Sequence, residues 1–411
     1  ILNADGFEEL LESEHWNIVP GGKYYVTRNN TSILAFKVGT KLDNYSFNIV
    51  TSHTDSPTFK VKENAEIEVK NKYTQLNTEG YGGMLCATWL DRPLSIAGRV
   101  LVSEGNSIVT KLLNIGRDLL MIPNVAIHMN RAANDGFKYN LQVDMLPLLS
   151  AGDDRQKDFK QIIADELGVK KEDILGHDLY LYNRMAPSIW GANEEFISAG
   201  HLDDLQCGFA SLKALLAGYN DESIDIMACF DNEEVGSGTK QGADSTLLRD
   251  TLTRINSALG KTEEDYHRAL ASSFMLSADN AHAVHPNHPE HTDATNCTYM
   301  NEGVVVKSHA GQKYTSDGVS MAVVKALASG ADVPLQYFAN RSDKAGGSTL
   351  GNIAMAQASM NAVDIGLPQL AMHSSYETAG IKDTYYAITL MKALFDSHIQ
   401  ETSTHSLEIK R

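Results

Sequence analysis

The sequence has few cysteines, and their spacing excludes two common uses of cysteine. None forms a Cys-x-x-Cys pair, so we expect neither a thiolate zinc site of that type nor a thioredoxin-like redox motif. Buried, reduced thiols are the simpler interpretation, and they are typical of a reducing compartment. The four residues are Cys86, Cys207, Cys229 and Cys297.

Positive charge is also scarce. The chain has 35 lysines and arginines against 52 acidic residues, a formal net charge of −17. Nucleic acids and anionic membrane surfaces are themselves negative, so we expect neither as a partner. No apolar run approaches the roughly 20 residues of a membrane span. No signal peptide is visible, although the sequence starts at Ile1 rather than Met and leaves a preceding targeting segment open. We therefore expect a soluble, cytoplasmic protein.

What the chain does have is length and a hydrophobic content of 43% over 411 residues, enough for more than one domain with a sizeable core. Residues 1–64 and 188–411 contain apolar strand-like runs that alternate with helical patterns. Residues 65–187 contain short β-like segments and one amphipathic helix, expected over 154–167 and closed by Gly168. We interpret this as an α/β sandwich domain split by a β-rich insertion.

Several local expectations follow from the same patterns. We expect a helix over residues 6–16, a hairpin from KYYVTR and ILAFKVG, a β segment at NVAIHM (124–129), and a long last helix over 383–399. A further helix is expected over 202–217, followed by Gly218. Its helical apolar stripe consists of Leu202, Leu205, Phe209, Leu212 and Leu216.

The stretch ACFDNEEVGSGTK places Asp231, Glu233 and Glu234 directly after the apolar run IDIMACF. A solvated turn is the simplest interpretation. However, sites in open α/β sheets collect at the carboxyl ends of strands. Successive side chains on an extended segment point to opposite sides. We therefore expect the two glutamates to have different tasks, one facing a metal ion and the other facing the substrate or a water molecule.

Two other clusters have similar positions. In SHTD, His53 and Asp55 are two residues apart and share one face of a strand, so one can ligate a metal while the other holds the imidazole. In GHLDDL, Asp203 and Asp204 begin the expected helix. These carboxylates either complement the helix dipole or supply a bridge between two metal ions.

Two more strand ends complete the pattern. Asp279 ends the strand SFMLSAD, and His373 ends QLAMH. Histidines also recur at 282, 285, 288 and 291, a spacing that can form a metal-binding tract of its own. Two prolines interrupt this tract, which favours a loop with one or two functional members. Glu377, three residues after Ser374, has the spacing of a helix capping box.

Together these clusters supply two histidines and three or four carboxylates. This mixed nitrogen and oxygen set suits Zn²⁺, Mn²⁺ or Co²⁺ rather than a thiolate site. It matches two divalent ions if one carboxylate bridges them. Two ions about 3.5–4 Å apart can activate a water and polarise a carbonyl or phosphoryl group, and a spare carboxylate can act as general base.

Long motifs, in order along nearly the whole chain, resemble the aspartyl aminopeptidases, a family of dinuclear zinc aminopeptidases. The resemblance implies an α/β catalytic domain (1–64 plus 188–411) interrupted by a dimerisation domain (65–187). It also implies small peptide substrates with a preference for acidic N-terminal residues (Asp or Glu), and dimers that assemble into a tetrahedral dodecamer. The motifs are PGGKYYVTRN, SHTDSPTFKVK, YGGMLCATWLDRPLSIAGRV, IPNVAIHMNR, DNEEVGSGTKQGADS, SADNAHAVHPN, GVVVK, QKYTSD and DIGLPQLAMHSSYETAG.

The resemblance also implies roles for single residues. Asp55 orients a metal-bound histidine, Glu233 is the general base, and Asp203 bridges the two ions. His128 helps to bind the substrate or the developing oxyanion. The implied metal ligands are His53, Asp203, Glu234, Asp279 and His373, and the implied substrate contacts are His128, His282, Lys307 and Tyr314.

Two departures from the family pattern leave the specificity open. Relatives often read Arg-Leu-Asp-Asn where this chain has His201-Leu202-Asp203-Asp204, and Cys-Gly-Ser-Thr where it has Gly346-Gly347-Ser348-Thr349. A broad-specificity aminopeptidase, a carboxypeptidase, a dipeptidase or a deacylase on the same scaffold are the alternative enzymes. A two-metal phosphoesterase and a non-catalytic oligomeric scaffold are the more distant alternatives.

Overall fold

The computed structural model describes residues 1–152 and 158–411. Its largest sheet has nine strands in the order β1-β2-β3-β13-β4-β14-β18-β16-β17. The strands are β1 (Glu8–Leu10), β2 (Lys23–Arg28), β3 (Ser32–Val38), β4 (Ser46–His53), β13 (Ser223–Phe230), β14 (Phe274–Ala278), β16 (Val304–Lys307), β17 (Leu335–Phe338) and β18 (Asn361–Gly366).

The centre of this sheet is parallel. β13, β4, β14 and β18 run in one direction, whereas β3 and β16 run antiparallel to their neighbours in that group. Every residue of β4, β13 and β14 is buried, as expected for strands covered on both faces. Phe230 pairs with His53 at the ends of β13 and β4, so these strands end at the same edge.

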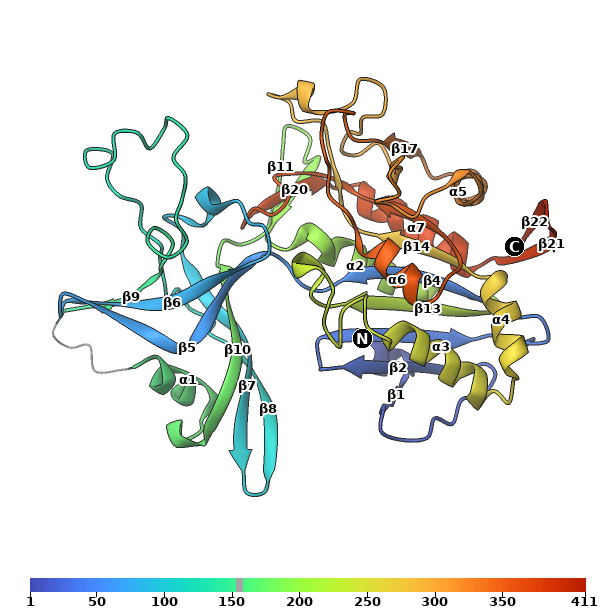
Figure 1. Ribbon diagram of the computed structural model, residues 1–411, viewed down its shortest axis with the longest axis horizontal. Helices are drawn as coiled ribbons and strands as arrows, with labels where there is room; N and C mark the ends of the chain where they lie inside the picture. The colour runs from blue at the N-terminus through green and yellow to red at the C-terminus, as the bar shows by residue number, and fades with distance from the viewer. Residues whose placement is uncertain (153–157) are drawn as a thin grey trace.

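Helices cover both faces of the nine-stranded sheet (Figure 1). Successive residues of β4 face opposite sides: Val50 joins the hydrophobic cluster of one face and Ile49 that of the other. α2 (Leu202–Ala217), α5 (Gly318–Gly330) and α7 (Asp383–Phe395) contribute to the first cluster. α3 (Leu247–Ala258), α4 (Glu263–Ala271) and α6 (Leu350–Gln357) contribute to the second. The expected α/β fold with a mixed sheet is confirmed.

A second sheet, with its own hydrophobic cluster, is antiparallel and has the order β8-β7-β10-β5-β6-β9. It stands apart from the nine-stranded sheet, on the left of Figure 1, with α1 (Phe159–Leu167) packed on it. Its strands are β5 (Thr58–Val69), β6 (Tyr73–Tyr81), β7 (Leu94–Glu104), β8 (Ser107–Asn114), β9 (Leu148–Ala151) and β10 (Ile174–Asn183).

Smaller elements complete the chain. A five-stranded sheet has the order β11-β12-β20-β19-β15, and β21 pairs with β22 near the C-terminus. These strands are β11 (Ser188–Trp190), β12 (Phe196–Ala199), β15 (Ala281–His282), β19 (Pro368–Leu370), β20 (Glu377–Gly380), β21 (His398–Ser403) and β22 (Ser406–Lys410). The short 3-10 helices are η1 (Leu2–Asp5), η2 (Cys86–Trp89), η3 (Lys171–Asp173), η4 (Glu233–Val235) and η5 (Pro289–His291).

Three local expectations were wrong. The segment 6–16 is not a helix, because Glu8–Leu10 pairs with β2 as strand β1, and this sheet pairing overrides the helical pattern. Residues 124–129 form no strand and are exposed. The last helix ends at Phe395 rather than 399, because β21 begins at His398.

The helix α2 has the expected bounds but a different buried face. Leu205 and Phe209 are 48% and 49% exposed, whereas Cys207, Ala210 and Ala214 are fully buried. Small side chains face the core because α2 packs against both β4 and α7. The apolar stripe therefore did not identify the face that contacts the sheet.

The inserted segment agrees in part with its expected helix. α1 begins at Phe159 after the N-cap residue Asp158, and Gly168 ends it in the left-handed conformation, with φ of 64°. Residues 154–157 of the expected helix lie outside the described residues. The boundary expected between residues 64 and 65 falls within β5, and the division into two domains stays a prediction. Within the described residues, no helix has both the length and the apolar character needed to cross a bilayer.

Candidate metal centre

Three chain segments place candidate ligands at one edge of the nine-stranded sheet. His53 is the last residue of β4, and Asp279 follows the last residue of the neighbouring β14. Asp203 lies in the first turn of α2. All three are buried, with exposed fractions of 1%, 8% and 3%. The meeting of parallel strand ends was the basis of the sequence prediction, and the structure brings these residues together.

The ring of His53 is oriented by the residue two positions later. Its Nδ1 lies 3.0 Å from the backbone oxygen of Asp55 and 3.5 Å from the Asp55 carboxylate. Because both groups accept hydrogen bonds, Nδ1 is the donor. In the neutral ring, the lone pair then lies on Nε2, which is 3.5 Å from Oδ1 of Asp203.

His373 has the same arrangement on the other side of Asp203. Its Nδ1 donates to the carbonyl oxygen of Gly83, at 2.8 Å. Its Nε2 lies 3.5 Å from Oδ2 of Asp203 and 3.4 Å from Oε2 of Glu234. β19 ends three residues before His373, so the ring is placed by a turn rather than by a strand end. Asp203 therefore presents one oxygen to each imidazole.

The electrostatics of this centre favour bound cations. Burial alone would raise the pKa of Asp203, but its contacts with His373 and His53 hold that pKa below the usual range. Burial raises the pKa of Glu234 to about 9. Oδ1 of Asp203, Oδ1 of Asp204 and Oε1 of Glu234 are buried without a hydrogen-bond partner. Buried carboxylate oxygens without partners are costly unless a cation meets them, so this donor set fits divalent metal ions.

Candidate donor atoms fall into three overlapping groups, and the donor atoms of each group lie within 4.8 Å of one another. The first group is fully buried, and the other two include half-buried residues. The first group contains His53 and three aspartates, the second contains His53 and two glutamates, and the third contains His373 with one residue of each kind. Asp203 belongs to both the first and the third. The groups are His53, Asp203, Asp204 and Asp279; His53, Glu233 and Glu234; and Asp203, Glu234 and His373.

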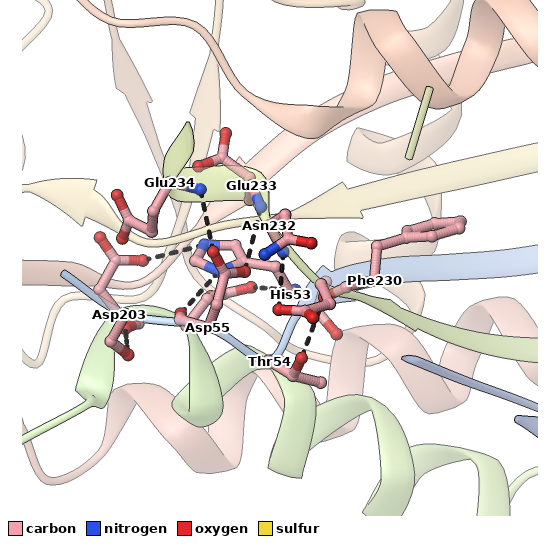
Figure 2. Close-up of polar contacts among 12 residues, drawn as sticks. His53, Thr54, Asp55, Asp203, Phe230, Asn232, Glu233 and Glu234 are labelled. Carbon is pink, nitrogen blue, oxygen red and sulfur yellow. Dashed lines mark hydrogen bonds and ion pairs between the residues drawn. The ribbon is translucent and has the colours of Figure 1, made fainter. Parts of the chain in front are cut away.

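The two adjacent glutamates lie in the short helix η4 and not on an extended segment. The argument from alternating strand faces was therefore wrong for this pair. The two side chains still diverge: in Figure 2, Glu234 points toward Asp203, and Glu233 points away from it. Burial, followed by the nearby carboxylate of Asp279, raises the pKa of Glu233 to about 7.

Asp55 fixes both the histidine and the glutamates. Its Oδ1 accepts a hydrogen bond from the backbone N–H of Glu233, and its Oδ2 accepts one from that of Glu234, each at 3.1 Å. Figure 2 shows these contacts as dashed lines between the backbone of η4 and Asp55. One carboxylate thereby sets the position of η4 relative to His53.

Tyr81, at the end of β6 in the second sheet, also reaches Asp55. Its hydroxyl donates to Oδ2 of Asp55 at 2.7 Å and accepts from Nδ2 of Asn232 at 2.7 Å. Sequence reasoning missed Tyr81 as a site residue. The only signal was its place in the motif YGGMLCATW, which carried the family resemblance.

Glu377 is a second residue that was missed. Its Oε2 accepts the backbone N–H of Asp203 at 3.0 Å, and its Oε1 accepts that of His373 at 2.7 Å. It lies in β20 and is buried, so the capping-box interpretation was wrong. Asp204, which the sequence offered beside Asp203 as a candidate bridging carboxylate, is fully buried and accepts the backbone N–H of His53 at 3.1 Å.

The expected substrate residues Lys307 and Tyr314 lie beside the centre. Nζ of Lys307 is 3.7 Å from Oδ1 of Asp279 and donates to the carbonyl of Asn280 at 2.8 Å. It also lies 5.7 Å from the centroid of the Tyr314 ring. Burial by itself lowers the pKa of Lys307, but Asp279 and Tyr314 more than offset this, so the ammonium stays charged.

The other two expected substrate residues are histidines in different settings. His282 is in β15, with its ring 6.0 Å from that of Phe338. His128 lies exposed between β8 and β9. The donor groups that the described residues form do not include it. Its role toward the substrate stays a prediction.

Comparison with known proteins shows the family of the chain. A family model described as "Aminopeptidase I zinc metalloprotease (M18)" matches residues 1–395. The chain belongs to the M18 aminopeptidase family. A probable M18 family aminopeptidase 2 of Clostridium novyi is 47% identical over 402 residues, covering 96% of this chain and 93% of the relative. One of Clostridium acetobutylicum is 48% identical over 391 residues, covering 94% and 90%.

Solved structures of M18 proteins share the fold. The yeast mApe1 dodecamer superposes with a TM-score of 0.83 at 28% identity, covering 96% of this chain and 90% of that one. A structure titled as the complex of Ape4 and Nbr1 gives a TM-score of 0.92 at 34% identity, covering 96% and 80%. As a member of the M18 family, the protein is a metalloaminopeptidase, an enzyme that hydrolyses peptide bonds.

Proposed function

We propose that this M18 aminopeptidase uses two divalent metal ions, Zn²⁺ by the family description, and that both ions would be held in part by Asp203. His53 and Asp279 would hold one ion, and Glu234 and His373 the other. Mn²⁺ and Co²⁺ suit the same nitrogen and oxygen donors. The zinc metalloprotease family supports the metal but leaves the number of ions open.

One observation carries this proposal. The two oxygens of Asp203 face different imidazoles, Oδ1 toward Nε2 of His53 and Oδ2 toward Nε2 of His373, each at 3.5 Å. Both imidazoles are oriented by a hydrogen bond from Nδ1. Because the two imidazoles face different oxygens of Asp203, the arrangement offers one histidine to each of two ions that would share this carboxylate.

Such ions would supply Lewis acidity, which would polarise the scissile carbonyl and lower the pKa of a water molecule. Glu233 takes the proton from the attacking water and then returns it to the leaving amine. Its carboxyl group therefore acts first as a general base and then as a general acid. Its position suits this task, because its side chain diverges from Glu234 while Asp55 fixes its backbone. Asp55 acts through His53 and η4 and is a positioning residue.

We also propose that the substrates are small peptides with an acidic N-terminal residue. The support is the resemblance to aspartyl aminopeptidases, together with the buried cation of Lys307. His128, His282 and Tyr314 are proposed as further substrate contacts. One observation favours a neutral N-terminal residue instead: the ammonium of Lys307 already faces Asp279 and donates to Asn280.

The assembly is proposed from the related structures. The yeast relative is described as a dodecamer, and we propose that this chain forms dimers through the segment 65–187 that assemble into a tetrahedral dodecamer. Light scattering or native mass spectrometry tests this, and a monomer at micromolar concentration would contradict it. A cytoplasmic location, with no nucleic acid or membrane partner, is part of the same proposal.

Hydrolysis of aminoacyl chromogenic amides tests the function. The panel holds N-terminal Asp, Glu, Leu and Lys, each with an N-acetylated control, after loading with Zn²⁺, Mn²⁺ or Co²⁺. We expect cleavage only with a free amine and a bound metal, with Asp and Glu ahead of Leu. A preference for Leu would overturn the acidic specificity and keep the mechanism. Release of acetate from the acetylated controls would indicate a deacylase, and no cleavage of any substrate by folded, metal-loaded protein would favour a scaffold.

A further inference from the structure

A second cluster of metal-type donors lies outside the catalytic centre. Donor atoms of His288, Glu290 and His291 lie within 4.8 Å of one another, and this group shares no residue with the three groups of the candidate metal centre. We infer that His288, Glu290 and His291 bind one additional divalent transition-metal ion, such as Zn²⁺, at the protein surface. This ion would be separate from those proposed for catalysis.

The backbone creates this cluster. The N–H of His288 donates to the carbonyl of His285 at 3.0 Å, and the N–H of His291 donates to that of His288 at 3.2 Å. Such turns place side chains three residues apart on one side. The rings of His288 and His291 accordingly stack, with centroids 5.3 Å apart and an interplanar angle of 23°. Pro289 begins η5 and restricts the loop.

The distances between donors suit a tetrahedral ion. Oε1 of Glu290 lies 3.1 Å from Nδ1 of His288 and 3.9 Å from Nε2 of His291. Zinc bonds of about 2.0–2.1 Å in a tetrahedron separate neighbouring ligands by about 3.3 Å. The ion would replace the proton that Nδ1 and the carboxylate now share. Small side-chain movements, which exposed residues can make, complete this geometry.

The hydrogen bonds also define which residues are ligands. The N–H of Asn287 donates to Nδ1 of His285 at 3.2 Å, so the proton of the neutral His285 ring is on Nε2 and neither nitrogen is free. His285 is therefore outside the ligand set, and a water molecule fills the fourth position. Arg341 donates to the backbone carbonyl of Glu290, and Thr292 donates to that of Pro289 at 2.8 Å, which holds the loop for binding.

An ion pair between exposed groups is the simpler explanation of these contacts, and it is worth little energy. The two explanations differ in metal content. Equilibrium dialysis against low-micromolar free Zn²⁺, followed by elemental analysis, counts the ions per chain. The test compares wild type with the double variant His288→Gln/His291→Gln. The control is His15→Gln/His405→Gln, which changes two exposed histidines elsewhere.

We expect the wild type and the control to bind one more ion per chain than the double variant. We also expect Glu290→Gln to weaken binding of that ion at least tenfold. The difference between variants does not depend on how many catalytic ions are bound, so it stands apart from the proposed mechanism. Unfolding midpoints confirm that each variant is folded. Equal metal content in the wild type, the control and the double variant would overturn the inference.

Discussion

The contact between Tyr81 and Asp55 makes a sharp prediction about activity. Tyr81→Phe removes only the hydroxyl that donates to Oδ2 of Asp55 at 2.7 Å. The ring should stay in place, because it packs edge-on against Tyr180 with centroids 5.6 Å apart. Asp55 would keep its bonds from Glu233 and Glu234 but lose the donor from the second sheet.

The size of the effect follows from the charge on Asp55. A hydrogen bond to a charged group contributes about 1.5–3 kcal/mol. Each 1.4 kcal/mol corresponds to roughly a tenfold change in rate. We therefore expect kcat to fall roughly 10- to 100-fold if the whole contribution is felt at the reacting centre. KM should change little, because Asp55 positions Glu233 and does not touch the substrate.

Steady-state hydrolysis of the preferred aminoacyl amide measures this effect, with metal content determined on the same samples. Tyr180→Phe is the matched control, since it removes a neighbouring hydroxyl and leaves the Asp55 contact intact. A kcat for Tyr81→Phe within twofold of the wild type, at equal metal content, would refute the positioning role. A loss explained entirely by lower metal content would assign Tyr81 to metal retention instead.

Three further predictions concern the centre and the core. Glu233→Gln should lower kcat by about 10²- to 10⁴-fold with unchanged metal content, and near-normal turnover would remove its role as base. Asp203→Asn should weaken the binding of both ions, measured by dialysis and elemental analysis; loss of one alone would argue against a bridge. Burial raises the pKa of Asp225 to about 8, so the folded protein binds this proton more tightly than the unfolded chain does. The protonated carboxyl therefore stabilises the fold fully below its ordinary pKa near 4, and this stabilisation is lost as pH rises toward 8. Asp225→Asn should flatten this decline in urea unfolding, and an unchanged pH profile would contradict the assignment.

The strand ends of the candidate site were predictable from local sequence. β4, β13 and β14 are continuous apolar runs because both faces of the sheet are covered, and His53, Asp231 and Asp279 end or follow these runs. Parallel strands then bring their ends to one edge. Sequence pattern therefore predicted which residues would lie together at the candidate site, although the family resemblance was needed to propose roles within it.

The residues that hold the ligands in place were not predictable in this way. Tyr81 reaches Asp55 from the second sheet, and Glu377 reaches Asp203 across 174 positions of the chain. Such contacts exist only once the sheets are assembled. The buried face of α2 was missed for a packing reason: Ala210 and Ala214 contact the core closely, while Leu205 stays exposed.

The proposal that Asp203 bridges two ions can be tested directly by anomalous X-ray scattering from zinc-loaded crystals, with data collected on both sides of the zinc absorption edge. The account predicts two ions, one beside His53 and Asp279 and the other beside Glu234 and His373, with Asp203 in contact with both. A single ion at the centre, or two ions that do not share Asp203, would contradict it.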